Sequence, residues 1–319
     1  MGPQTLSLEL ASLAGRPFVQ GPIHQPPSAQ PNNWTIELEK FREQAESGQQ
    51  LFGMASINRT EFEVVLHYPM HIFERWPNWN QVMSKPSGER LQLMRDANTR
   101  ERFREDMRTD PIAGIFPFKW DLLTLGRSVT GRWNAYEGKS VPQIAAELGK
   151  DPVDAFLDVV VDEELMAQFR YPDTRWPDES MLMDIVKTPH MVIGMSDAGA
   201  HMTSQIDSGF PTYLLGHWVR EQGALTAEEA VHILSARPAD ELGITDRGRL
   251  QPGQAADIVL LELNQVGAGE RVFANDLPGG GRRLVQHAKG IETVIVNGAE
   301  VRKANRDTGD LTGQIVRSR

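Results

Sequence analysis

The stretch Val192–His201, VIGMSDAGAH, combines an apolar run with an acid, glycines and a histidine. Asp197 follows the apolar run, which reads as a strand, and Gly194 and Gly199 allow the backbone to turn sharply or to approach a ligand. In parallel α/β folds, functional groups gather where the strands end. A carboxylate there can ligate a metal ion or take a proton from a metal-bound water. Spacing alone leaves an alternative, in which Asp197 and Ser196 only cap a following helix.

Three polar residues after Asp197 are candidates for contacts with a substrate. His201 is four residues further on, so a helix beginning here would place both side chains on one face. We expect His201 to contact substrate or to orient Asp197; the alternative is a surface histidine. Thr203 and Ser204 are expected to line a pocket, although polar loop residues more often bond only to the backbone.

Two arginines and two histidines elsewhere have suggestive spacings. Arg282 and Arg283 follow PGGG in a loop-like stretch and could bind a substrate carboxylate, although such a pair is more often solvated or structural. His67 and His71 have the spacing of helical zinc sites, but the proline between them argues against a helix. PGGGRR lacks the flanking strand and helix of a phosphate-binding loop.

Alternating helical and strand-like segments surround these residues. Apolar spacing predicts helices over 6–15 and 34–48, and strands over 16–23 and 50–57. This alternation is typical of a parallel α/β sheet. Residues 60–135 are less regular and are expected to form helices and long loops over one end of that sheet.

Helix boundaries are clearer in the second half of the chain. Ser140 is predicted to begin a helix that Gly149 ends, and Asp151 followed by Pro152 marks another helix start. Residues 181–197 predict a helix and then a strand, and residues 226–243 open with a capping box.

The pattern of apolar and polar residues changes after Gly248. Residues 248–263 and 291–302 are strand-like, and Asn297-Gly298 is a strong signal for a two-residue hairpin turn. We therefore divide the chain into an α/β portion, residues 1–245, and a small β-rich portion, residues 246–319.

Composition excludes several classes of function. The 319 residues carry a net charge of −10, which disfavours a nucleic-acid groove because phosphate binding requires clustered Lys and Arg. The absence of cysteine excludes disulfides and thiolate chemistry. We see neither a signal peptide nor a long apolar run, so we expect a cytoplasmic protein without a membrane partner.

Several blocks resemble the C-terminal portion of the amidohydrolase superfamily, and within it the N-acyl-D-amino-acid deacylase (D-aminoacylase) group. The resemblance is strongest from about residue 140 onward. It is carried by IGMSDAGAH, SGFPTYLLGHWVRE, ARPADELGITDRGRLQPGQAADIVLLEL, DLPGGGRRLVQHAKGIETVIVNG and TGDLTGQIVR.

The resemblance implies a (β/α)8 barrel of the TIM type, a small β-sandwich, and hydrolysis of amide C–N bonds at a metal site. Asp197 matches the acid on the last barrel strand, which accepts a proton from the metal-activated water and returns it to the departing amine. The implied substrate is a small N-acyl amino acid or related amide. The implied cofactor is a divalent metal, zinc first, with Asp197 as one ligand and His24 near the position of another.

The sequence departs from that family pattern at the first barrel strand, where the family has His-x-His. No such pair occurs among the eight histidines. His24 is offset from the ligand position on a strand that resembles the sixth. The strand-like segments around residues 16–23, 50–57 and 191–197 then correspond to the sixth to eighth barrel strands.

This correspondence predicts that the chain is the late part of a longer barrel, a fragment or one piece of a split enzyme. Three strands cannot close a barrel, so we expect a second copy or the missing segment to cover the sheet edge. The rival hypothesis is a non-catalytic subunit or binding protein that keeps the fold without the metal.

Overall fold

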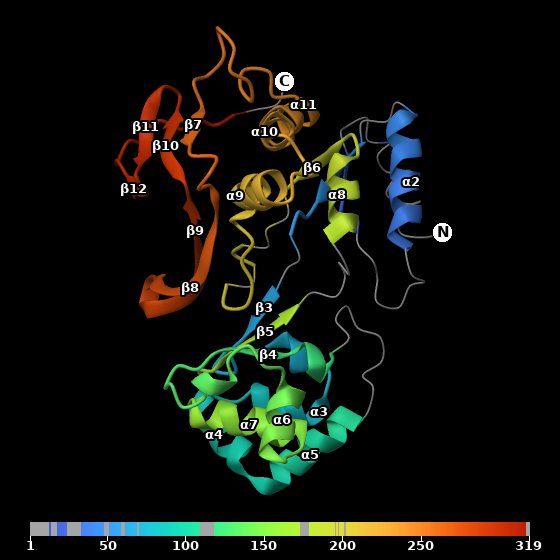
Figure 1. Ribbon diagram of the computed structural model, residues 1–319, viewed down its shortest axis with the longest axis vertical. Helices are drawn as coiled ribbons and strands as arrows, with labels where there is room; N and C mark the ends of the chain where they lie inside the picture. Colours follow the sequence, from blue (N-terminus) through green and yellow to red (C-terminus); the bar gives the residue numbers. More distant parts are fainter. Residues whose placement is uncertain are drawn as a thin grey trace.

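The computed structural model describes residues 13, 18–23, 33–47, 51–58, 61–68, 70–108, 118–172, 179–194, 196, 198–200 and 202–316. The architecture is α/β, with a parallel-sheet part, an inserted unit and a β-rich C-terminal part (Figure 1). None of the helices within these ranges is long and apolar enough to cross a lipid bilayer.

The parallel-sheet part contains three short strands that pair in chain order. They are β1 (Phe18–Gln20), β2 (Leu51–Ala55) and β6 (Met191–Ile193), and both pairings are parallel. Helix α2 (Asn33–Glu46) connects β1 to β2, and α8 (Glu179–Lys187) leads into β6. The predicted alternation of helix and strand is confirmed here, whereas the helix expected over 6–15 falls almost entirely outside the described residues.

Helical segments after β6 complete this part and share its core. These are α9 (Phe210–Tyr213), π-helical turns over Leu214–Glu221, α10 (Ala227–Val231), further π-helical turns over His232–Ala236, and α11 (Arg237–Glu241). The predicted capping box is present, because the Glu229 backbone N–H donates to Thr226 Oγ1 and Glu229 Oε2 accepts from the Thr226 backbone.

The inserted unit, residues 61–172, has a core of its own and is larger than the stretch of 60–135 that we expected. Strands β3 (Glu61–Val64), β5 (Gln168–Pro172) and β4 (Thr124–Arg127) form an antiparallel sheet in that order. The sequence pattern missed this extent because β3 pairs with a strand about a hundred residues away. The described helices that pack with this sheet are α3 (Pro77–Met83), α4 (Ser87–Arg95), α5 (Ala97–Arg108), α6 (Val141–Leu148) and α7 (Pro152–Asp162).

Local sequence signals determine the helix ends of this unit. Gly149 ends α6 in the left-handed conformation, and the Asp151 carboxylate caps α7 by accepting from the Val153 backbone at 2.8 Å. Aromatic packing then fixes the core, with the Trp79 ring stacked between Phe73 at 4.6 Å and Phe103 at 4.0 Å.

The β-rich part has a four-stranded antiparallel sheet and a long two-stranded hairpin. The sheet contains β12 (Arg306–Asp307), β11 (Ala299–Lys303), β10 (Ile291–Val296) and β7 (Ile258–Leu261), in that order. The hairpin joins β8 (Gly267–Leu277) to β9 (Gly281–Lys289). The predicted turn at Asn297-Gly298 is confirmed, since both residues have positive φ.

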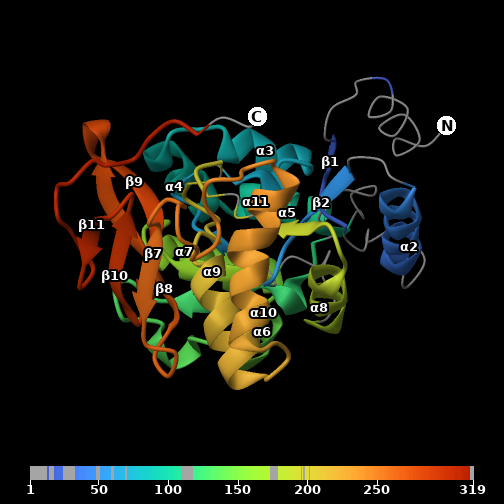
Figure 2. The ribbon, with the colours of Figure 1, turned by 90° about the horizontal axis from the view of Figure 1, so that it is seen from above.

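The β-rich part lies to one side of the α9–α11 helices, and the β8–β9 hairpin extends toward the inserted unit (Figures 1 and 2). One prediction about the hairpin was wrong. Arg282 and Arg283 lie in strand β9 and not in a loop, because the turn is made by Pro278–Gly280.

Candidate functional site

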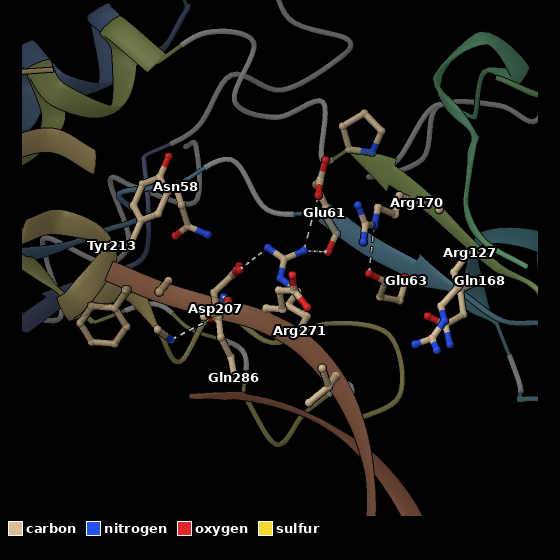
Figure 3. Close-up of a pocket in the computed structure, with 18 of the residues that line it drawn as sticks. Asn58, Glu61, Glu63, Arg127, Gln168, Arg170, Asp207, Tyr213, Arg271 and Gln286 are labelled. Atoms are coloured by element: carbon tan, nitrogen blue, oxygen red, sulfur yellow. Dashed lines mark hydrogen bonds and ion pairs between the residues drawn. The ribbon is translucent and has the colours of Figure 1, made fainter. Parts of the chain in front are cut away.

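A polar pocket of about 1170 Å³ lies where the three parts of the molecule meet (Figure 3). Its walls come from the β3 and β5 strands of the inserted unit, from the start of α8 and α9, and from the β8–β9 hairpin. The side chains that carry its chemistry are Glu61, Glu63, Arg170, Glu179, Asp207, Tyr213, Arg271 and Gln286.

Backbone hydrogen bonds close the segment that follows β6 on itself and join it to the inserted unit and to the β8–β9 hairpin. The Asp207 N–H donates to the Ser196 carbonyl at 3.0 Å, within the parallel-sheet part. The Ser204 carbonyl accepts from the Glu63 N–H on β3 at 2.7 Å, and the Met202 carbonyl accepts from Leu284 on β9 at 2.7 Å. The chain immediately before Asp197 is therefore bonded to Asp207, a residue of the pocket wall.

Arg271 lies at the middle of the pocket, between Asp207 and Glu61 in Figure 3. Its Nη2 is 3.1 Å from Asp207 Oδ1, and its Nη1 donates to the Glu61 carbonyl at 3.2 Å. Asp207 is 4% exposed, so this ion pair is largely shielded from water. One guanidinium thus connects the hairpin, the segment after β6 and the inserted unit.

Glu63 forms a second, less complete ion pair on the side of the pocket that the inserted unit provides. Its Oε1 is 3.3 Å from Arg170 Nε, while Oε2 is buried with no hydrogen-bond partner among the described residues. Burial raises the pKa of the Glu63 carboxyl, against the lowering effect of Arg170 and Arg271.

Glu179 of α8 and Tyr213 of α9 line the opposite end of the pocket, and both contact His217 of the π-helical turns that follow α9. His217 Nε2 lies 3.3 Å from Glu179 Oε2, its Nδ1 lies 3.2 Å from Glu221 Oε2, and its ring stacks on Tyr213 at 4.8 Å. Burial, followed by the charges of the nearby carboxylates, raises the pKa of the Tyr213 phenol. Tyr213 therefore keeps its proton and presents a neutral hydroxyl.

The predicted site residues are not gathered in this pocket. Asp197, His201 and His24 lie outside the described residues. Thr203 is half-buried and Ser204 is buried, and neither side chain lines the pocket. The described residues 198–200 and 202–204 form turns, and the next described helix begins at Phe210. The sequence-based possibility of a helix that begins directly after Asp197 is therefore contradicted.

The two predicted arginines have partners elsewhere on the hairpin. Arg283 forms a two-pronged ion pair with Asp276, with both distances 2.8 Å. The Arg282 guanidinium lies over the Phe273 ring, 3.8 Å from its centre. That Arg282 or Arg283 contacts the substrate stays a prediction.

Sequence reasoning missed Glu63, Asp207 and Arg271. One signal was present in EFEV, residues 61–64, where acids alternate with Phe62 and Val64. Such alternation predicts a strand with one polar face. In the structure Phe62 and Val64 join the core of the inserted unit and the acids line the pocket.

The described residues do not offer a metal site. Among them, no three His, Cys, Asp or Glu side chains lie together in a way that could hold a metal ion. His67 and His71, the pair with helical zinc spacing, occupy a turn and the start of a 3-10 helix, as the intervening proline indicated.

Comparison with known protein families identifies the family of this chain. The model of the amidohydrolase family matches residues 123–302, which is more than half of the chain. The chain belongs to the amidohydrolase family. The match runs from β4 of the inserted unit to β11, so it includes Asp207, Arg271 and most of the pocket wall.

Relatives of this amidohydrolase-family chain include two proteins of Alcaligenes xylosoxydans xylosoxydans. A D-aminoacylase is 29% identical over 250 residues, which are 74% of this chain and 47% of the relative. An N-acyl-D-glutamate deacylase is 39% identical over 90 residues, which are 28% of this chain and 17% of the relative.

Among solved structures, the N-acyl-D-glutamate deacylase from Bordetella bronchiseptica, complexed with zinc and a phosphonate inhibitor, has a similar fold. It is 20% identical, with a TM-score of 0.50, over 95% of this chain and 50% of that chain. The chain thus spans about half the length, or less, of the relatives it matches.

Proposed function

We propose that this amidohydrolase-family chain takes part in the hydrolysis of the amide C–N bond of a small N-acyl amino acid or related amide. Its relatives are named as deacylases of such compounds. The observation that carries the proposal is the bond between Ser196 and Asp207, which ties the chain beside Asp197 to the wall of a large polar pocket.

Asp197 is proposed as the proton-transfer residue. A carboxylate beside the scissile amide accepts a proton as water attacks and returns it to the departing amine, and one group can serve both steps. Arg271 lines the pocket, and we propose its guanidinium, which is paired with Asp207, as the cation that binds the substrate carboxylate. Contacts from His201, Thr203, Ser204, Arg282 and Arg283 are retained as weaker proposals, because none of the described four lines the pocket.

The proposal includes a divalent metal, although the described residues contain no group of side chains that could hold one. We propose Asp197 and His24 as ligands in a complete site, with zinc as the first metal to test. When bound, such an ion polarises the amide and lowers the pKa of water. We further propose that the α/β portion is the late part of a (β/α)8 barrel and that the β-rich portion is a segment of a β-sandwich. We also propose a cytoplasmic location, and a second copy or a further segment that completes the site.

A non-catalytic subunit or binding protein is the second candidate. It is favoured by one observation in the sequence, the absence of a His-x-His pair among the eight histidines. Under this hypothesis the pocket binds a small molecule and no bond is broken.

Metal content and amide hydrolysis discriminate between the two. The chain would be purified through a tag from its own cells, together with whatever accompanies it. Bound metal would be measured by mass spectrometry, and release of free amino acid would be measured from a panel of N-acetyl amino acids. Stoichiometric zinc with release supports the hydrolase; a metal-free assembly that releases nothing contradicts it and favours the subunit.

A further inference from the structure

Glu63 is a buried carboxylate on the pocket wall that the proposed hydrolysis does not use. The residue is 4% exposed, yet its Oε2 has no hydrogen-bond partner among the described residues. Among the described residues, its Oε1 pairs with Nε of Arg170 at 3.3 Å, and the Arg170 side chain is 51% exposed. The inserted unit thus places a buried acid with one unpaired oxygen beside a half-exposed cation.

A buried charge with an unpaired oxygen is costly to keep. An acceptor removed from water without a partner loses its full hydration, and the loss is larger for a charged group. Burial dominates the electrostatics here, since it raises the pKa of Glu63 in spite of two nearby arginines. A donor with positive charge would remove this penalty most completely.

The charge of the whole pocket favours such a donor. Among the described lining residues, acids outnumber arginines by six to three: Glu61, Glu63, Glu137, Glu179, Asp207 and Glu270 against Arg127, Arg170 and Arg271. The count includes Arg271, which lies near both Asp207 and Glu61, so the lining keeps a surplus of negative charge. A pocket lined with surplus charge of one sign concentrates ligands of the other.

We propose that Glu63 is a specificity-determining residue that binds the cationic end of the substrate, an ammonium or guanidinium, in the place now taken by Arg170. Resting on the proposed function, this makes the substrate class the N-acyl derivatives of basic amino acids. Arg271 of the hairpin and Glu63 of the inserted unit both line a pocket of about 1170 Å³, so the two ends of one such molecule have separate partners.

Binding of a matched pair of ligands tests the proposal. Nα-acetyllysine and Nα-acetylnorleucine share a carbon skeleton and differ by the terminal ammonium. Titration calorimetry on the full chain, with each enantiomer, is expected to show that Nα-acetyllysine binds at least about tenfold tighter. Glu63→Gln is expected to reduce this ratio to about one while affinity for the norleucine compound stays the same.

Two further variants separate the role of Glu63 from general charge and from folding. Glu270→Gln removes an exposed acid that also lines the pocket and is expected to keep the preference. Arg170→Met removes the competing cation and is expected to bind Nα-acetyllysine more tightly than the wild type; a purely structural ion pair would give weaker binding. Thermal melting followed by circular dichroism checks that each variant is folded.

The proposal is overturned if wild type binds both compounds equally or binds neither, if Glu63→Gln keeps the preference, or if Arg170→Met weakens it. These readouts require no turnover. A cation preference without amide hydrolysis would contradict the proposed function alone, and hydrolysis without the preference would contradict this inference alone.

Discussion

Arg271 Nη2 and Asp207 Oδ1 lie 3.1 Å apart, and this ion pair joins the long hairpin to the segment that follows β6. Both side chains are largely buried, and the same guanidinium donates to the Glu61 carbonyl of the inserted unit. One cation thus bonds to three segments that are distant in the sequence, in addition to the backbone hydrogen bonds that join them.

Arg271→Met is therefore expected to destabilise the fold strongly. Removing one partner of a buried pair leaves the other charge poorly compensated, which costs about 3–5 kcal/mol. Urea denaturation measures the loss. Arg283→Met is the matched control on the same hairpin, because it breaks the exposed pair with Asp276 and should cost less than about 1 kcal/mol. Equal losses for the two variants would show that the Arg271 pair has no special role.

Glu163 is expected to hold the loop that borders the pocket at Ser128. Its carboxylate accepts from the Ser128 and Thr130 hydroxyls and from the backbone N–H groups of Val129 and Thr130, at 2.6–2.8 Å. Glu163→Gln replaces some of these acceptor sites by a donor and should cost about 1.5–3 kcal/mol at neutral pH. The exposed neighbour Glu164, changed to Gln, is the control.

The pH dependence of that loss has a defined sign. Burial works to raise the pKa of Glu163, but the hydrogen bonds outweigh it and the folded pKa lies below the usual 4.5. The stabilisation is present above pH 4.5 and disappears as the pH falls through the folded pKa. The gap between wild type and Glu163→Gln should narrow in acid; a constant gap down to pH 3 would contradict this.

Glu63→Gln is expected to have the opposite effect on stability. Burial raises the folded pKa of Glu63 above 4.5, so its contribution to stability is fully present below pH 4.5 and is lost as the pH rises through the raised value. At pH 7 the amide avoids the cost of burying a charge, and the variant should melt at or above the wild-type temperature. A clear loss of stability at pH 7 would show that Arg170 and Arg271 leave the ionised form well compensated.

Local signals in the sequence predicted local structure well. The start of α7 at Asp151, the end of α6 at Gly149, the capping box at Thr226 and the turn at Asn297 depend on residues a few positions apart. Their backbone geometry is determined by nearest neighbours, so a single sequence contains it. The family resemblance was likewise readable from blocks of contiguous residues, and the family model confirms it.

The pocket could not be predicted in the same way, because its ion pairs join segments that are far apart in the sequence. Glu63 and Arg170 are 107 positions apart, and Arg271 and Asp207 are 64 apart. Nothing local distinguishes Arg271 from Arg283, which had the more suggestive neighbours but pairs within its own hairpin. Register between β8 and β9, and the path of the inserted unit, decide which arginine reaches the pocket.

The central claim is that Asp197 moves the proton in amide hydrolysis, and Asp197→Asn tests it most directly. The assembly purified from its own cells with zinc would be compared with the same assembly carrying this variant, by release of amino acid from N-acetyl amino acids. General acid–base groups contribute about 10²–10⁴-fold, so kcat should fall at least about a hundredfold while the melting temperature and composition of the assembly stay the same. Unchanged turnover in a folded Asp197→Asn assembly would contradict the account.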